Sequence, residues 1–288
     1  MAVDTFIPEV WSAQLQVALA QYLVTGQPGV INRDYEGEIA NQGDTVHIGA
    51  IGRPTVSTYT KNTTVLAPEV LATTDQSLLI DQAKSFDFKL DDVDKAQTRA
   101  GGQLLNRAAE EAAKSVAEVI DSYLLTLMSA GAGKILTPQA VGTADAAFLL
   151  LRQLNMWMNK VSAPRSGRWA VVSPEFEALV LGDPRFIDAS KYGSSTPILN
   201  GEIGRAVGFN VMVSNQLPVG TAATNPAVSN FVIAGHGMAT TFASQISKVE
   251  AFRPEASFSD AIKGLSLYGA KVVRPEGLVV CDVDVTVA

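Results

Sequence analysis

The strongest hydrophobic pattern in the chain lies between residues 91 and 128. From Gln103 onward, apolar residues recur every three or four positions, the spacing of a single stripe along an α-helix. The stripe comprises Leu105, Ala109, Ala112, Val116, Val119, Ile120, Tyr123, Leu124 and Leu127. The opposite, solvated side is predicted to carry Glu110, Glu111, Lys114, Glu118 and Asp121. The pattern predicts a long amphipathic helix that serves as a spine.

The ends of this helix are also marked in the sequence. Acidic residues favour a helix N-terminus, where we place Asp91, Asp92 and Asp94, with a kink or break at Gly101 and Gly102. Gly131 and Gly133 are predicted to end the helix. At 1.5 Å per residue, Gln103 to Met128 alone spans about 39 Å, longer than a small domain is wide.

Alternating apolar and polar residues upstream of the helix predict two strands, Thr45–Ile51 and Leu78–Leu90. The 25 residues between them, 52–76, include seven threonines and two prolines. A compact hairpin needs only two to five residues there, so we predict a projecting two-stranded arm. A short helical pattern within residues 1–43 precedes it and is interpreted as a docking arm.

Residues after the helix predict an α/β lobe. Thr143 is placed to cap a helix whose apolar stripe ends near Val161, and Trp169–Val172 has the composition of a short strand. Ser173, Pro174 and Glu175 have the order of a helix cap, a first-turn proline and an acid at the positive helix end. Further strands are predicted at Phe209–Val213, Phe231–Ala234 and, after a turn at Pro275–Gly277, at Leu278–Val287.

Composition narrows the class of protein. The chain has 288 residues, of which 47% are hydrophobic, and its formal net charge is −7. It contains no run of Lys or Arg, which argues against a protein that grips nucleic acid by counterion release. No apolar run is long enough for a membrane span and the first residues do not resemble a signal peptide, so we expect no membrane association and assembly where the chain is made.

The candidate ligands and nucleophiles give no catalytic pattern. His47 and His236 lack partners at zinc-ligand spacing, and Ser173 lacks the flanking glycines of a nucleophile elbow. Cys281 alternates with valines and is interpreted as a buried structural thiol. Asp282 and Asp284 are expected on the outer face of that strand as solvated charges.

Two glycine-bearing stretches resemble phosphate-binding loops only superficially. The segment MSAGAGKI (128–135) has Met128 and Ile135 where a phosphate loop needs glycine and a hydroxyl, so we interpret it as a flexible helix exit. The glycines at 201, 204 and 208 do not have dinucleotide-binding spacing and predict a tight helix-to-strand passage. We therefore predict no enzyme activity and no cofactor or metal.

The order of these parts, with three particular stretches, resembles a known family. The stretches are GRWAVVSPEFEALVLGDPRF (167–186), GEIGRAVGFNVMVSNQLP (201–218) and FSDAIKGLSLYGAKVVRPEGLVVCDV (258–283). Nearly the whole chain is similar to the major capsid proteins of tailed bacteriophages, with the α+β fold named after phage HK97, and more closely to the branch that includes the coat protein of phage P22.

The resemblance implies a division of the chain. Residues 1–43 would be an N-terminal arm, 44–90 an extended loop reaching a neighbouring subunit, and 91–134 the spine helix and peripheral domain. Residues 135–250 would be the axial domain and 251–288 the C-terminal strands of the peripheral domain. The implied function is self-assembly into pentamers and hexamers of an icosahedral head that encloses double-stranded DNA and forms in the host bacterial cytoplasm.

The resemblance also implies contacts and partners. We expect Tyr59, Lys61, Asn62 and Thr64 of the extended loop to contact other subunits, and we expect a scaffolding protein, a portal protein, a possible cement protein and weakly held packaged DNA as partners.

Some relatives weld their shells by a Lys–Asn isopeptide bond. Residues 251–288 contain no Asn, so we predict a shell without that crosslink. Residues 1–43 are too short to include a large scaffolding segment, which predicts a separate scaffolding protein.

Two other functions compete with this interpretation. An encapsulin-like compartment would share the fold but enclose a cargo enzyme, and would bind cargo peptides on its inner wall. A small α/β enzyme would hold a substrate in the lobe at 135–250. The absence of a catalytic constellation in the sequence and the length of the arm argue against the enzyme.

Overall fold

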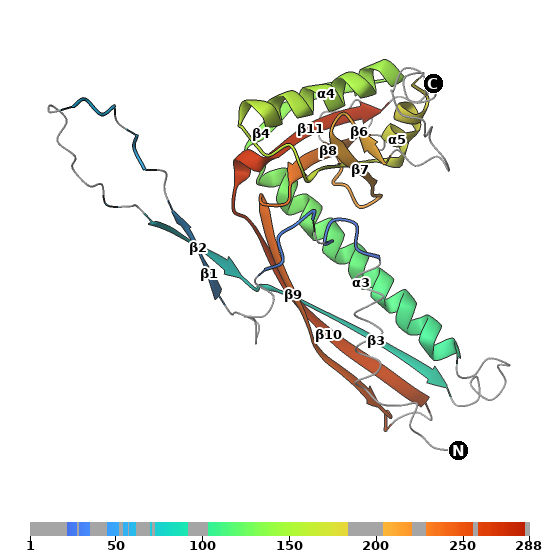
Figure 1. The fold of residues 1–288 in the computed structure, drawn as a ribbon. Helices are drawn as coiled ribbons and strands as arrows, with labels where there is room; N and C mark the ends of the chain where they lie inside the picture. Colours follow the sequence, from blue (N-terminus) through green and yellow to red (C-terminus); the bar gives the residue numbers. More distant parts are fainter. Residues whose placement is uncertain are drawn as a thin grey trace.

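The structure is a computed structural model, shown in Figure 1. It describes residues 22–27, 29–34, 45–51, 54–56, 58–61, 70, 73–91, 103–183, 204–220, 229–255 and 259–285. Its helices are α3 (Gln103–Ala130), α4 (Ala144–Lys160), α5 (Pro174–Leu181) and the short 3₁₀ helix η3 (Pro275–Gly277). Its strands are β1 (Thr45–Ile51), β2 (Thr73–Leu79), β3 (Gln82–Asp91), β4 (Lys134–Val141), β5 (Arg168–Val172), β6 (Arg205–Ala206), β7 (Phe209–Val213), β8 (Ser229–His236), β9 (Thr240–Phe252), β10 (Ser259–Val272) and β11 (Leu278–Val285).

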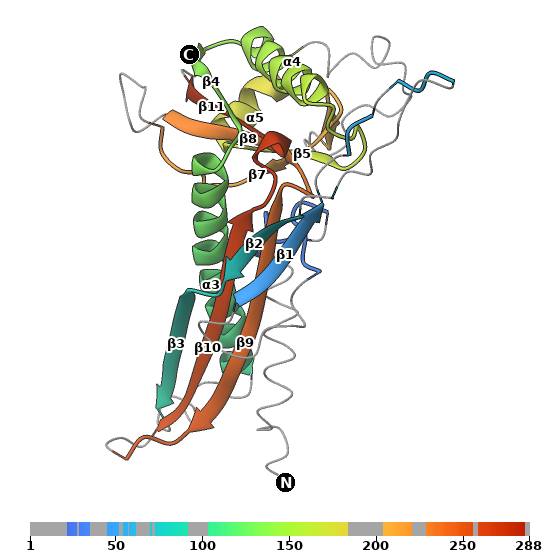
Figure 2. The ribbon, with the colours of Figure 1, turned by 90° about the vertical axis from the view of Figure 1, so that its left-hand side faces the viewer.

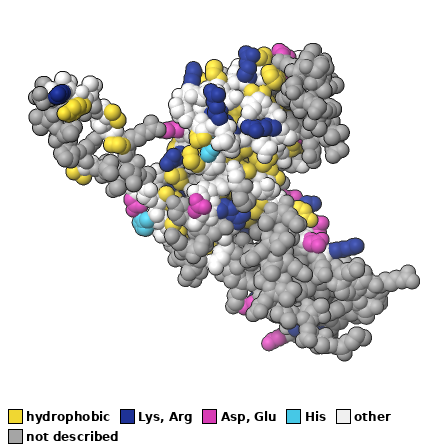
Figure 3. Space-filling model, in the orientation of Figure 1, with side chains coloured by type: hydrophobic (Ala, Val, Ile, Leu, Met, Phe, Trp, Pro, Cys, Tyr) yellow, Lys and Arg dark blue, Asp and Glu magenta, His cyan; other side chains and the backbone are white. Residues whose placement is uncertain are grey.

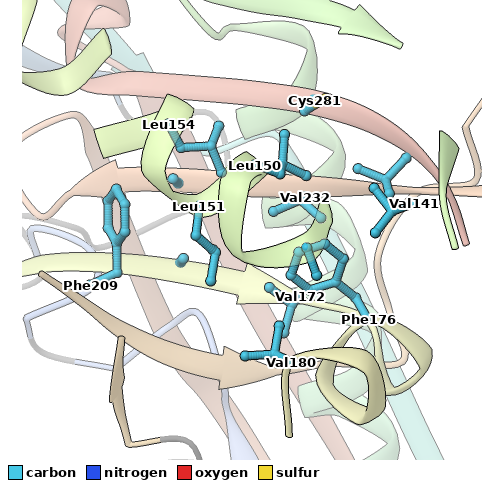
Figure 4. Close-up of a cluster of buried hydrophobic side chains, with 14 of the residues drawn as sticks. Val141, Leu150, Leu151, Leu154, Val172, Phe176, Val180, Phe209, Val232 and Cys281 are labelled. Carbon is cyan, nitrogen blue, oxygen red and sulfur yellow. The ribbon is translucent and has the colours of Figure 1, made fainter. Parts of the chain in front are cut away.

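A mixed sheet of six strands, in the order β4-β11-β8-β5-β7-β6, forms an α/β lobe with α4 and α5. The side chains of α4 that follow the predicted stripe are buried against this sheet, as Figure 4 shows for Leu150, Leu151 and Leu154. Both predicted caps are present. The Thr143 Oγ1 accepts from the Ala146 N–H at 3.3 Å, and the Ser173 Oγ accepts from the Phe176 N–H at 3.3 Å.

The second sheet is a long antiparallel ribbon in the order β3-β10-β9, referred to here as the long sheet. Helix α3 covers one face, where its Tyr123 meets Tyr268 of β10 with ring centroids 5.4 Å apart. The antiparallel β1–β2 hairpin covers the other face near the α/β lobe. Figure 2 shows the resulting three layers of hairpin, long sheet and helix.

The predicted long amphipathic helix is present as α3, but its start and its buried face differ from the prediction. The helix begins at Gln103, and Asp91 lies at the end of β3 rather than in a first helical turn; Asp92 and Asp94 lie outside the described residues. The buried stripe is rotated so that Val119 is exposed while Asp121 is buried. It consists of Ala113, Val116, Ala117, Ile120, Asp121, Leu124, Leu125 and Met128. The end at Ala130, before Gly131, is as predicted.

The strand predictions need three corrections. Leu78–Leu90 is not one strand, because the chain bends at Ile80 and Asp81 and passes from the hairpin to the long sheet. Strands β4 and β9 were not predicted, and β4 begins directly after the supposed flexible exit. That exit is closely packed: the Gly133 N–H donates to the Pro275 carbonyl at 2.8 Å, and a side chain at Gly133 would meet that backbone.

Strand β11 is buried on both faces, which overturns the prediction for Asp282. Cys281 and Val283 face α4, while Val280 faces α3, because β11 lies inside the six-stranded sheet. Asp282 is therefore only 4% exposed instead of solvated. The boundary predicted at residue 250 falls inside β9, and residues 251–288 contribute strands to both sheets.

Candidate intersubunit surfaces

The base of the arm is fixed to the long sheet by an apolar cluster. Val46, Ile48, Leu78 and Ile80 of the arm are buried against Ala243 of β9 and Leu267 of β10. The Lys271 Nζ also donates to the Ser77 carbonyl oxygen at 2.8 Å. Burial of several aliphatic side chains, each contributing about 1.5–3 kcal/mol, gives the hairpin a defined direction relative to the sheet.

A glycine allows the hairpin to approach the sheet closely. A Cβ atom at Gly269 of β10 would overlap the Leu79 carbonyl oxygen and would lie 3.0 Å from the Ile80 Cα. The backbone of the hairpin therefore rests directly on the backbone of β10. No larger residue fits this crossing without moving one of the two layers.

Beyond its base, the arm projects away from the rest of the described chain, as Figure 1 shows, and it carries exposed apolar side chains. Strand pairing ends at Ile51 and Thr73. Val56 is 94% exposed, Tyr59 66% and Val70 90%. An exposed run of this kind on a projecting element is typical of a surface that associates with another molecule.

Of the residues predicted to contact other subunits, the structure describes two. Tyr59 and Lys61 are exposed on the projecting part of the arm, only two positions apart. Asn62 and Thr64 lie outside the described residues. Nothing in this chain's described core covers the Tyr59 ring, which leaves it available to a neighbouring molecule.

An N-terminal segment, residues 22–34, crosses between α3 and β9 and was not placed by the sequence. Leu23, Val30 and Ile31 are buried in the cluster under α3. The Asn32 N–H donates to the Thr240 carbonyl at 3.0 Å, and the Asn32 carbonyl accepts from the Phe242 N–H at 2.9 Å. The segment thus adds backbone hydrogen bonds to the edge of the long sheet of its own chain.

The carboxylate of Asp121 holds this segment against α3. Asp121 is 2% exposed. Its Oδ2 accepts from the Val24 N–H at 2.8 Å, and its Oδ1 accepts from the Thr25 N–H at 3.0 Å and from the Thr25 hydroxyl. Burial raises the pKa of Asp121, although the hydrogen bonds from Thr25 and Val24 oppose the rise. The sequence signal that could have revealed the burial of Asp121 is the spacing of this residue, which lies four residues after Ala117 and three before Leu124 on the buried stripe.

The direction of this pKa shift predicts a pH dependence. The pKa of Asp121 is higher in the folded chain than its usual 3.8, so folding favours the protonated carboxyl. The resulting addition to the free energy of unfolding is greatest below pH 3.8, and it is lost as the pH rises through the pKa of the folded chain. Urea unfolding of the wild type and of Asp121→Asn, compared from pH 3.5 to 7, isolates the effect, because the other carboxyls are common to both. We expect the stability difference, wild type minus variant, to fall with rising pH. A difference that rises with pH would contradict the prediction.

The side chains tested for chemistry have structural roles. The His47 Nδ1 lies 2.7 Å from the Asp75 Oδ2 on the exposed face of the hairpin, and the His236 ring bridges the Ser166 carbonyl and the Met238 N–H. Within the described ranges, no three His, Cys, Asp or Glu side chains converge as metal ligands would. None of the helices in those ranges is long and apolar enough to cross a bilayer.

The glycines at 204 and 208 form a β-hairpin, not the predicted helix-to-strand passage. Strand β6 pairs with β7 through Arg205–Asn210 and Ala206–Phe209. The two turn residues, Val207 and Gly208, have φ angles of 50° and 86°, the left-handed values of a two-residue hairpin turn. Gly201 lies outside the described residues.

Burial makes Cys281 an unreactive thiol. The side chain lies in the core beneath α4 (Figure 4), and burial raises its pKa to about 12. We expect an aromatic disulfide reagent at pH 8 to label the folded chain far more slowly than the chain in concentrated urea, because only the thiolate attacks. Absorbance of the released thiol measures both rates. Equal rates would show that Cys281 is accessible in the folded chain.

Known proteins share the sequence pattern and the fold of this chain. Residues 73–281 match the model of a family described as phage capsid protein. A structure of Mycobacterium phage Che8 has 33% sequence identity and a TM-score of 0.71, covering 87% of this chain and 88% of its own. No curated protein matches the chain.

Two less similar structures share the fold. The capsid structure of the cyanophage P-SCSP1u has 14% identity and a TM-score of 0.68, with 90% of this chain and 86% of the other covered. The mature capsid of bacteriophage PhiM1 has 15% identity and a TM-score of 0.64, with coverage of 83% and 82%.

The fold, with its projecting arm, is that of a structural protein that builds a viral shell from many copies of itself. The chain belongs to the phage capsid protein family, and it is a phage major capsid protein that self-assembles into the capsid of the virion. The predicted α+β class and the predicted capsid function are confirmed.

Proposed function

We propose that this chain forms the pentamers and hexamers of an icosahedral head with the HK97 fold, which encloses double-stranded DNA. The observation that carries the proposal is the likeness to the Mycobacterium phage Che8 structure over 87% of the chain at 33% identity. Closed symmetric shells need one surface that contacts a different surface on the next copy, and a projecting arm provides the first of these surfaces. Membership of the branch that includes the coat protein of phage P22 is part of the proposal.

The domains follow from the two sheets. We assign 1–43 to the N-terminal arm, 44–90 apart from β3 to the extended loop, and α3 with the long sheet, which includes β3, to the peripheral domain. The part of the α/β lobe that lies within 135–250 is assigned to the axial domain. Because β11 pairs with β4 and β8, it goes with the axial domain, whereas β9 goes with the peripheral domain.

Electron microscopy tests this function. The chain, co-expressed with the scaffolding candidate of its phage, is expected to give uniform icosahedral shells with pentamers at the vertices. Particles from infected cells are expected to contain double-stranded DNA. Shells filled with a cargo enzyme would favour the encapsulin-like alternative, and a chain that stays monomeric with scaffold present would overturn the proposal.

Within the shell, we assign the intersubunit contact of the extended loop to Tyr59, Lys61, Asn62 and Thr64. The exposed Tyr59 ring gives this assignment its physical basis. Replacing Tyr59 by Ser is expected to lower shell yield while leaving the unfolding midpoint of the unassembled chain unchanged. The matched control is Met156→Ser, since Met156 is equally an exposed apolar residue but lies on α4.

The remaining partners are those of head assembly. We assign scaffolding to a separate protein, DNA entry to a portal protein, and external reinforcement to contacts or a cement protein, with assembly in the host cytoplasm. The shell is proposed to lack the Lys–Asn crosslink. Mature particles on a denaturing gel are expected to give a single band at the mass of the chain, and a ladder of covalent multimers would overturn this.

A further inference from the structure

Four cationic side chains, here named the basic rim, gather at one end of the α/β lobe. Lys134 and Lys160 lie on the Trp157 ring, with their Nζ atoms 4.6 Å and 4.3 Å from its centroid. Arg165 follows shortly after α4. Arg274 belongs to the turn that meets the start of β4, through the Gly133–Pro275 hydrogen bond described above. Figure 3 shows Lys and Arg side chains predominating over acidic ones on this lobe.

A hollow of about 270 Å³ opens beside the basic rim. Its lining includes Val161, Ala163, Pro164, Met238, Arg274 and Glu276. Two exposed apolar residues, Val161 and Met238, are here named the apolar floor of the hollow; the polar side chains of Ser162 and His236 line it as well, next to the cationic edge. The His236 ring at this hollow is held by two contacts: its Nδ1 accepts from the Met238 N–H at 3.2 Å, and its Nε2 lies 3.0 Å from the Ser166 carbonyl oxygen.

The charge of the rim is not neutralised by this chain's described residues. Within those residues, no ion pair joins Lys134, Lys160, Arg165 or Arg274 to a carboxylate. Glu276 is the one acidic residue in the lining. An occupant that combines carboxylates with apolar side chains would neutralise the rim and cover the floor together.

We propose that this hollow and the basic rim receive the acidic stretch 34–44 of a neighbouring copy of the chain. The stretch reads DYEGEIANQGD, with four carboxylates, no cation, and Tyr35 and Ile39 as apolar residues. Asp34 is exposed in this structure. Residues 35–44 lie outside the described residues, and their acidic and apolar sequence is the reason for assigning them to this contact. DNA would match the rim but leave the apolar floor uncovered. The inference rests on the proposed shell, in which copies abut one another.

Disulfide trapping in shells tests the contact. One chain carries Ile39→Cys and a second, differently tagged chain carries Met238→Cys; the buried Cys281 does not interfere. After co-assembly and mild oxidation, we expect a dimer of the two tagged chains on a non-reducing gel. The control replaces Met156, an exposed residue of α4, by Cys, and is expected to give about tenfold less dimer.

Charge variants test the chemistry of the same contact. Arg165→Glu/Arg274→Glu in the receiving chain is expected to reduce the trapped dimer about tenfold, whereas Arg165→Lys/Arg274→Lys retains it. Glu36→Gln/Glu38→Gln in the donating chain should reduce it too, because this variant removes two of the four carboxylates of the stretch. The Glu variant is compared by circular dichroism with the wild type to establish that it is folded.

Each result has a distinct meaning. Wild-type shells without the trapped dimer would overturn this inference and leave the proposed function standing, whereas failure of the wild type to form shells would overturn both. A single chain that carries both cysteines could instead form the disulfide within itself. If the yield of that disulfide did not fall on dilution with wild-type chains, the stretch would lie in the hollow of its own chain, which would overturn the inference. Duplex DNA bound through the rim, with no trapped dimer, would assign the rim to nucleic acid.

Discussion

Replacing Asp121 by Ala is expected to lower the free energy of unfolding by about 2–4 kcal/mol, the largest effect of any single polar substitution proposed here. The carboxylate accepts hydrogen bonds from the backbone N–H groups of Val24 and Thr25, and it is buried. Removing it leaves the buried Thr25 N–H and the half-buried Val24 N–H without an acceptor, and a buried donor left unpaired costs about 1–3 kcal/mol. Urea unfolding of the unassembled chain, followed by circular dichroism, measures the loss.

Glu118→Ala is the matched control, because Glu118 lies on the exposed side of the same helix. It is expected to change stability by no more than about 0.5 kcal/mol. Asp121→Asn, which keeps one acceptor oxygen, should fall between the two. If Asp121→Ala were as mild as the control, the N-terminal segment would not be held by this carboxylate.

Replacing Gly269 by Ala is expected to displace the base of the arm from its position on β10 and to lower shell yield sharply. The new Cβ would collide with the backbone of Leu79 and Ile80, which has no rotamer to move away, so one layer must shift. Overpacking of this kind costs about 1–3 kcal/mol. Because 1.4 kcal/mol is a factor of ten in an equilibrium constant, the equilibrium constant for docking the arm on the sheet falls about tenfold for each 1.4 kcal/mol lost. Shell yield on a sucrose gradient and the urea midpoint report the two consequences.

Gly49 provides a control on the same hairpin. A Cβ at Gly49 meets no atom within 4 Å, and its φ is not left-handed, so Gly49→Ala is expected to assemble like the wild type. Equal behaviour of the two alanine variants would show that the close crossing at Gly269 does not determine the direction of the arm.

The sequence was most informative where structure depends on local spacing. The stripe of α4, the caps at Thr143 and Ser173, and the proline opening α5 all follow from contacts within a few residues, and all are present. The long helix was predicted for the same reason. Its first residue was misplaced, because acidic residues favour a helix start but do not prevent Asp91 from pairing in β3.

Burial of charged residues was not predictable from local pattern. Asp282 alternates with valines as a surface residue would, but β11 lies between β4 and β8 with helices on both sides. Asp121 was assigned to solvent because nothing in the sequence shows that residues 22–34 return to cover that side of α3. For the candidate contact surfaces, the exposed arm was predicted, whereas the hollow at the basic rim joins three turns far apart in the chain.

Local patterns in the sequence were enough to predict the elements of this protein: an amphipathic helix, an α/β lobe, an extended threonine-rich arm and the lack of a recognisable catalytic motif. Helical and strand periods arise from residues close together in the chain, so they can be recognised without knowing which elements pack against each other. The tertiary structure decided which face of α3 is buried, which strands share a sheet, and how closely the arm crosses β10 at Gly269. These depend on contacts between elements that are not neighbours in the chain, such as Gly269 with Leu79 and Asp121 with Thr25, which no local spacing records.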